Sequence, residues 1–236
     1  MSLVDQKICA WGGPFAATTL GIGLLMAGFV PPPAPTLSAE EIAAVYQGNA
    51  LLIRLGMIIS LFGIAGYAAL VCVVSVQMRR IKASSLLPVY LQLGAGSIGV
   101  LTVMFPTMLF AIAAFRPERE PALTQLLNDV AWLLIIPAFP TFIAQFCGVA
   151  FGVFQDKSSV PVYPRWVGFF NLWVAVLFVP GGFAYLFQTG PFAWNGILAF
   201  WVAAGAFFLW LNVMTPMTLK AISNQKREPL GQPAFA

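Results

Sequence analysis

The sequence predicts an all-α protein, a polytopic transmembrane bundle of six helices. Hydrophobic residues make up 60% of the 236 residues and charged residues only 8%, whereas soluble domains carry about 25% charged residues. The apolar runs are continuous over about twenty residues or more, the length that a helix needs to cross a bilayer. They lack the alternation with period two that is typical of membrane β-barrels.

Six apolar runs are candidate spans, at residues 8–30, 50–76, 87–115, 123–153, 167–187 and 194–219. The first follows Lys7 and is too long for the apolar part of a typical signal peptide, so we expect it to be retained as a helix. We expect one membrane domain over residues 1–222 and a polar cytoplasmic tail over 223–236.

The charges between the spans predict an orientation. Two arginines of the third loop stand beside two glutamates, so that this loop is balanced, and Glu40 and Glu41 lie in the first loop. Basic residues accumulate in the alternate segments: Lys7, Arg79, Arg80, Lys82, Lys157, Arg165 and Lys220. Because cytoplasmic segments carry the excess of lysine and arginine, we expect both termini in the cytoplasm.

The first external loop, "VPPPAPTLSAEEIAAVYQGN", is the longest. Its prolines favour an extended segment. Ser38 and Glu41 have the spacing of a capping box, which predicts a short amphipathic helix after Ser38. That helix either lies on the outer surface or runs straight into the second span.

Two ionisable residues, Arg54 and Asp129, lie inside the predicted spans, and Asn128 precedes Asp129. Counting residues from the cytoplasmic ends places Arg54 and Asp129 near the outer boundary at similar height. Three interpretations stay open: two side chains in the headgroup zone, a structural ion pair, or a pair that faces a ligand.

Amides and helix-breaking residues mark the spans as well. Gln145 lies near mid-membrane, and Gln92, Asn171 and Asn212 lie nearer the cytoplasm. Such amides either join helices or line a polar path. The prolines of the outer half are Pro106, Pro137, Pro140 and Pro180, the last followed by Gly181 and Gly182. They predict broken helices around a cavity open to the outside, or kinks that only shape the bundle.

Several chemistries are not favoured. The chain has no histidine, and Cys9, Cys72 and Cys147 are far apart in the sequence. We therefore expect no cofactor and no metal, and the cysteines are interpreted as small apolar fillers. No phosphate loop, nucleophile elbow or pair of catalytic carboxylates occurs, so an enzyme is not favoured. The basic residues lie in short clusters between spans and do not indicate nucleic acid binding.

Two stretches, "AFRPEREPALTQLLNDVAWLL" and "YPRWVGFFNLWVAVLFVPGGFAYLFQTGPFAWNGILAFW", together resemble a group of uncharacterised six-span bacterial membrane proteins. The resemblance covers most of the chain after about Arg54. It implies a multi-pass protein of the bacterial inner (plasma) membrane, and it implies no activity.

Two hypotheses of function follow. In the first, the protein binds or transports a small, mostly uncharged or apolar molecule through an outward-facing cavity. Arg54, Asn128 and Asp129 form its polar rim, and the path and wall are formed by Gln145, Trp132, Phe139 and Trp173. In the second, the chain is a non-catalytic accessory subunit. Faces of small residues such as Gly148 and Gly152 would then pack against another copy or another membrane protein.

Overall fold

The computed structural model describes residues 2–82 and 85–225, and within these residues the chain is helical without strands. The elements in chain order are α1 (Leu3–Ala10), α2 (Gly12–Met26), α3 (Ala39–Met78), α4 (Leu87–Ala113), α5 (Pro121–Ile135), α6 (Phe139–Gln155), α7 (Arg165–Phe178), the 3₁₀ helix η1 (Val179–Tyr185), the π-helix η2 (Ile197–Val202) and α8 (Ala203–Gln225). The short helices lie next to longer ones: α1 precedes α2, η1 follows α7, and η2 precedes α8.

These elements combine into helical segments that are long and apolar enough to cross a membrane. The described residues contain 6 of them: Leu3–Met26, Ala39–Met78, Leu87–Ala113, Pro121–Gln155, Arg165–Tyr185 and Ile197–Gln225. The all-α prediction and the prediction of six spans are therefore confirmed. The chain is a multi-pass integral membrane protein whose apolar outer surface contacts the lipid bilayer.

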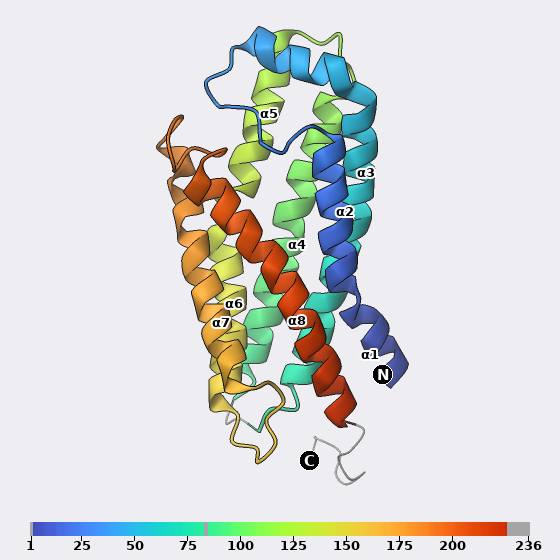
Figure 1. The fold of residues 1–236 in the computed structure, drawn as a ribbon, viewed down its shortest axis with the longest axis vertical. Helices are drawn as coiled ribbons and strands as arrows, with labels where there is room; N and C mark the ends of the chain where they lie inside the picture. The colour runs from blue at the N-terminus through green and yellow to red at the C-terminus, as the bar shows by residue number, and fades with distance from the viewer. Residues whose placement is uncertain (1, 83–84, 226–236) are drawn as a thin grey trace.

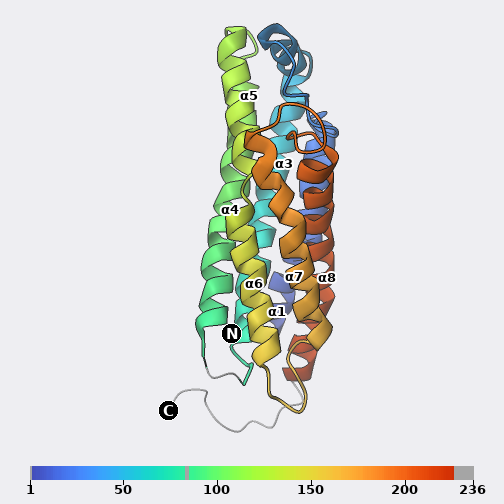
Figure 2. The same cartoon turned by 90° about the vertical axis from the view of Figure 1, so that its left-hand side faces the viewer.

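The spans form an elongated bundle (Figures 1 and 2). We call the end with the start of α5 and the α2–α3 loop the upper end, as in Figure 1, and the opposite end the lower end. α1 begins and α8 ends toward the lower end. α3 contacts α1, α2, α4, α5, α6 and α8, so that this helix is the centre of the bundle.

Glycines bring α2 and α3 together. Gly23 and Gly56 face each other, and a Cβ atom on either one would overlap the carbonyl oxygen of the other. Gly12 and Gly66 meet in the same way near the other end of α2. Without side chains at these positions the two backbones touch, and this close approach supplies the van der Waals contacts that hold membrane helices together.

The start of α3 agrees with its local sequence signal. The backbone N–H of Glu41 donates to the Ser38 hydroxyl (3.2 Å), and the Ser38 N–H donates to the Glu41 carboxylate (2.8 Å). The helix that begins here continues into the second span through a kink at Asn49 (φ −133°, ψ 20°). The Asn49 amide donates to the carbonyl oxygen of Met26 (3.2 Å), which ties the kink to the end of α2.

The fourth span is interrupted at Pro137, between α5 and α6. Proline lacks an N–H, so the carbonyl of Leu133, four residues earlier, has no helical partner. The hydroxyl of Tyr185 donates to this oxygen (3.0 Å). Next to it, the backbone of Gly181 in η1 lies against the carbonyl oxygen of Ile136. The break in the fourth span and the 3₁₀ turn of the fifth span therefore stabilise each other.

The third span is not interrupted, which corrects the expectation based on Pro106. α4 is continuous from Leu87 to Ala113 with Pro106 inside it. A proline in a membrane helix costs one hydrogen bond and a slight bend, and packing against neighbouring helices compensates for this. The sixth span, in contrast, is irregular, since it begins with the π-helix η2.

The boundary of the expected tail remains a prediction. α8 continues to Gln225, so residues 223–225 are helical. Residues 226–236, which make up the rest of the tail, lie outside the described residues.

Candidate functional site

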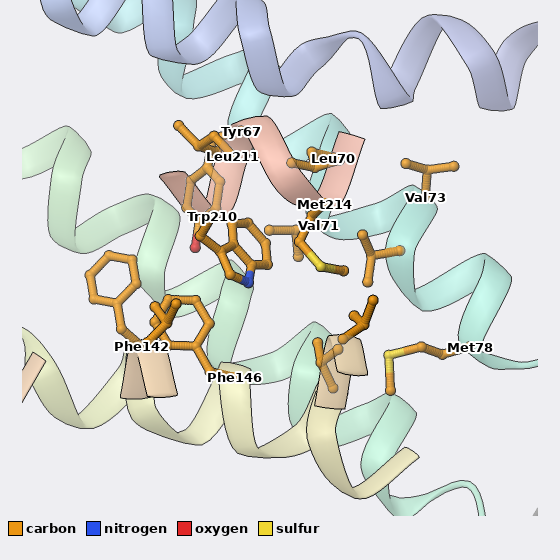
Figure 3. Packing of buried hydrophobic residues seen from close by; sticks show 14 of the residues in the cluster. Tyr67, Leu70, Val71, Val73, Met78, Phe142, Phe146, Trp210, Leu211 and Met214 are labelled. Carbon is orange, nitrogen blue, oxygen red and sulfur yellow. The ribbon is translucent and has the colours of Figure 1, made fainter. Parts of the chain in front are cut away.

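The buried apolar side chains form two clusters. The lower cluster joins α3, α6 and α8, and Figure 3 shows Trp210 at its centre between Tyr67 and Phe146. The ring centroid of Trp210 lies 6.3 Å from that of Tyr67 and 5.3 Å from that of Phe146. These three rings come from the regular helices α3, α6 and α8.

The upper cluster is built from aromatic rings around Trp132 of α5. Phe110 lies 4.8 Å from Trp132 between ring centroids, Phe29 lies 5.6 Å away and Phe200 of η2 lies 6.1 Å away. Trp132 and Phe29 are completely or almost completely buried. The irregular segments η1 and η2 contribute Ala184 and Phe200 to this upper cluster.

A cavity of about 110 Å³ lies where the two clusters meet. Its walls are almost entirely apolar and come from both clusters. The lining residues are Leu20, Leu24, Met57, Ser60, Val103, Thr107, Phe110, Trp132, Ile135, Ile136, Phe142, Phe178, Ala199, Phe200, Ala203, Ala204, Phe207 and Phe208. An apolar cavity of about 150 Å³ can stay dry and bind benzene or xenon, so this one suits a ligand of that size.

Aromatic rings close the cavity above and below. Phe110, Trp132 and Phe200 belong to the upper cluster and form a roof toward the upper end. Phe142 and Phe178, whose ring centroids are 5.1 Å apart, belong to the lower cluster and form a floor. The sequence predicted a cavity open on the membrane side of the α2–α3 loop, which lies at the upper end, whereas the roof lies between this cavity and that end.

Two hydroxyl groups interrupt the apolar lining. The Thr107 hydroxyl donates to the carbonyl of Val103 (2.8 Å), so its donor is used. Ser60 is 2% exposed, and its Oγ has no hydrogen-bond partner among the described residues. A serine in a helix normally donates to the carbonyl four residues earlier. Ser60 is therefore the cavity residue whose hydroxyl has no protein partner, and this hydroxyl lies against the backbone of Gly23 at the contact of α2 and α3.

An amide above the roof holds Trp132 in place. The Oδ1 atom of Asn128 accepts hydrogen bonds from Trp132 Nε1 and from the Tyr46 hydroxyl, both at 3.1 Å. Its Nδ2 donates to the carboxylate of Asp129 (3.1 Å). Asn128 is fully buried, so all its bonds are made to protein groups. Asn128 and Asp129 thus support the roof and do not line the cavity.

Arg54 is not part of this group. Tyr46, and not Arg54, reaches Asn128 from α3, and Arg54 lies eight residues further along, roughly 12 Å of helix. Arg54 and Asp129 form no ion pair in the structure. Arg54 lines a separate groove on the outer surface of α3 and α4. The structure therefore does not bring together the polar rim expected from the sequence.

The other predicted site residues also lie apart, except for Trp132. The ring of Phe139 packs against Gly182 of η1, and Trp173 is 52% exposed. Gln145 is buried, accepts a hydrogen bond from the Tyr67 hydroxyl (2.6 Å) and has no partner for its Nε2 among the described residues. None of the three lines the cavity.

Of the three amides expected nearer the cytoplasm, Asn171 and Gln92 join helices. The buried Asn171 accepts from Trp210 Nε1 (2.8 Å) and donates to the Val167 carbonyl (2.8 Å). Gln92 pairs with Ser75. Asn212 is exposed and donates to the carbonyl of Phe208 (2.8 Å). At the lower end, Tyr163 and Thr218 share a hydrogen bond (3.1 Å), and burial raises the pKa of Tyr163, which keeps it neutral.

The side of the cavity is formed by α2 and α8. Near the lower end these helices touch, since Gly13 of α2 lies against the Thr215 hydroxyl of α8, which donates to the carbonyl of Ala10 at the end of α1 (3.2 Å). They diverge toward the upper end (Figure 1). Leu24 of α2 and Ala204 of α8, both half-buried, line the cavity where the helices have diverged.

No protein-family model, curated protein or solved structure matches the chain. In the part of the chain that the structure describes, no three His, Cys, Asp or Glu side chains are grouped closely enough to hold a metal ion. The lining of the cavity is apolar apart from the hydroxyl residues Ser60 and Thr107.

Sequence reasoning missed Ser60, Thr107 and Phe200. The two hydroxyls lie inside apolar runs, where serine and threonine commonly bond their own helix, so nothing in the sequence marks them. Phe200 follows a loop and lies in a π-helix, and such segments occur often at functional sites. Pro180 and the two glycines after it were the only sequence signal near this part of the fold.

Proposed function

We propose that this protein binds a small, mostly apolar molecule with one hydrogen-bonding group in the cavity between its two buried clusters. The observation that carries the proposal is an almost entirely apolar cavity whose lining includes Ser60, a buried serine whose hydroxyl has no partner among the described residues. A buried polar group without a partner costs about 1–3 kcal/mol. A ligand that pairs with it recovers this cost and also covers the apolar walls.

The ligand reaches the cavity from the side. The roof blocks the upper end and the floor the lower end, whereas Leu24 and Ala204 border it where α2 and α8 diverge. An apolar molecule is concentrated in the bilayer, because burial of its surface is worth about 25 cal/mol per Å². Entry between α2 and α8 therefore needs no aqueous path. Displacement of Trp132 from the roof would then release the ligand toward the upper end, which would make the protein a transporter.

The direct experiment is to identify what the protein retains. Wild-type protein and an Ala204→Phe variant, whose new ring fills the cavity, are extracted into native-lipid discs, and their small molecules are compared by mass spectrometry. Ala65→Phe is the matched control, because Ala65 is exposed on α3. We expect one compound to be enriched in the wild type and the control and absent from Ala204→Phe. Identical profiles for three folded proteins would contradict the proposal.

The orientation of the chain belongs to the same proposal. Lys157 and the arginines and lysine after α3 lie in the two loops of the lower end, and the acidic Glu40 and Glu41 lie at the upper end. This distribution supports a cytoplasmic lower end, and therefore cytoplasmic termini. With the resemblance to bacterial six-span proteins, it supports a location in the bacterial inner membrane.

The accessory-subunit hypothesis receives no support from its main feature. Gly148 faces the backbone of Gln92 and Pro88, and Gly152 faces the end of the Met78 side chain. These small residues contact other helices of the same chain. The mass of the native assembly tests the alternative: a defined oligomer or a constant partner would favour it over ligand binding alone.

A further inference from the structure

A second hollow lies on the outside of the bundle, between the upper halves of α3 and α4. This groove encloses about 450 Å³ and is lined by Leu51, Arg54, Leu55, Ile58, Ala111, Ile112 and Phe115. Its apolar members are strongly exposed, for example Leu51 at 62% and Phe115 at 63%. Arg54 is the one charged side chain in its lining, so the groove combines a cation with an apolar channel.

The charge of Arg54 is not balanced by the protein. Its Nε donates to the carbonyl oxygen of Ala50, one turn toward the upper end (3.3 Å), which turns the guanidinium in that direction. No carboxylate of the described residues forms an ion pair with it. The remaining N–H groups of the guanidinium fork are therefore available to an anion, and phosphate is an anion whose geometry this fork matches.

A second arginine reaches the head of the same groove. Arg119 NH1 donates to the carbonyl oxygen of Ile112 (3.3 Å), and Ile112 is one of the groove residues. Arg54 from α3 and Arg119 from the loop after α4 thus both approach Ile112. Arg54 is the charge of the groove lining, and Arg119, whose loop also carries Glu118 and Glu120, adds a second guanidinium group near its head.

The depth of Arg54 fits a lipid headgroup. Arg54 precedes Arg79, at the lower end of α3, by 25 residues, roughly 37 Å of helix. The hydrocarbon core of a bilayer is about 30 Å thick. When Arg79 lies at the lower interface, Arg54 lies just beyond the opposite edge of the hydrocarbon, among the phosphates. Leu55 and Ile58 continue the groove from there into the hydrocarbon.

We propose that this groove is a binding site for an anionic phospholipid of the leaflet at the upper end. The lipid phosphate binds between the guanidinium groups of Arg54 and Arg119. One acyl chain lies along Leu55, Ile58 and Ala111. This site is separate from the central cavity and does not depend on the function proposed for it.

Native mass spectrometry tests the lipid site. The protein is reconstituted in discs of phosphatidylcholine with a minor share of phosphatidylglycerol, and the lipids that remain bound after release are identified. We expect wild-type protein to retain phosphatidylglycerol in excess of its share. The Arg54→Gln variant should reduce that excess roughly fivefold, the effect of one basic side chain near a charged membrane. Arg116→Gln removes the same charge from an exposed side chain outside the groove and should leave the excess unchanged.

A second variant keeps the test valid if Arg54→Gln fails to fold. Ala111→Trp fills the groove and retains both arginines, and we expect it to lose the bound phosphatidylglycerol as well. Retention of phosphatidylglycerol by the wild type only in proportion to its share of the disc lipids would overturn the proposal. An unchanged excess in folded Arg54→Gln or Ala111→Trp would overturn it too, as would an equal loss in Arg116→Gln.

Discussion

Trp132 donates a hydrogen bond from its indole Nε1 to Oδ1 of Asn128, one helical turn away on α5, at 3.1 Å. The same oxygen accepts from the Tyr46 hydroxyl of α3. The indole packs against the rings of Phe29 and Phe110, and it lines the cavity. One buried amide therefore joins two helices and fixes the ring that roofs the candidate ligand site.

Replacement of Asn128 by alanine should destabilise the protein by about 2 kcal/mol, because it leaves the Tyr46 hydroxyl and the Trp132 indole N–H buried without an acceptor. Reversible unfolding in mixed micelles measures the change. Asn212→Ala is the control, since the Asn212 side chain is exposed and bonds only its own helix. Equal stability of the two variants would show that the Asn128 bonds do not hold the roof.

Loss of the Tyr185 hydroxyl should loosen the break in the fourth span. Tyr185→Phe removes the donor to the Leu133 carbonyl that Pro137 leaves free, and we expect a cost of about 1 kcal/mol. Hydrogen exchange should rise in α5 and η1 and stay unchanged in α2. The exposed Tyr90 has no side-chain hydrogen bond in the structure, so Tyr90→Phe should change neither quantity. Faster exchange in Tyr90→Phe alone would contradict this account of the break.

The small residues of α6 should prove to be folding determinants. A Cβ atom at Gly148 would lie 2.8 Å from the backbone nitrogen of Gln92, so Gly148→Ala should separate α4 from α6 and destabilise the monomer by about 1–3 kcal/mol. Gly94 has open space around it, and Gly94→Ala should be neutral or stabilising by up to about 1 kcal/mol. A Gly148→Ala variant of normal stability that loses an oligomer would support the accessory-subunit hypothesis instead.

Local signals and hydropathy were enough to predict much of this fold. The spans follow from the length of apolar sequence that a bilayer requires, and the capping box at Ser38 depends on residues three apart. The break at Pro137 was also predicted, because proline removes a helical hydrogen bond wherever it occurs. The continuity of α4 through Pro106 was not, because neighbouring helices decide whether such a helix stays intact.

The candidate site was much less predictable. Of the residues expected to bind a ligand, Trp132 lines the cavity, and it was chosen as an aromatic on the fourth span. Heights counted along straight helices placed Arg54 level with Asp129, but the count to Asp129 runs through the break between α5 and α6, and Tyr46 rather than Arg54 pairs with Asn128. A cavity forms where the side chains of segments distant in the sequence leave space unfilled, and this packing cannot be read from a single sequence.

Entry from the bilayer can be tested with thiol reagents. In a background with Cys9, Cys72 and Cys147 replaced by alanine, Ala204→Cys places a thiol on the cavity wall between α2 and α8. We expect it to react with neutral methyl methanethiosulfonate and resist the cationic trimethylammonium reagent, because a permanent charge does not cross hydrocarbon. A thiol at the exposed Gln188 should react with both. Reaction of the Ala204→Cys thiol with both reagents, or with neither, would contradict lateral entry.

The most direct measurement is the affinity of fluorobenzene and 4-fluorophenol for the protein in lipid discs, followed by ¹⁹F NMR. Both probes should bind the wild type, and neither should bind Ala204→Phe. The signal of the probes with the Ala204→Phe variant therefore measures their partition into the lipid. Ser60→Ala should keep the affinity for fluorobenzene and weaken that for 4-fluorophenol roughly fivefold, the effect of one hydrogen bond of about 1 kcal/mol. Binding of both probes that is unchanged in Ala204→Phe would contradict the central claim.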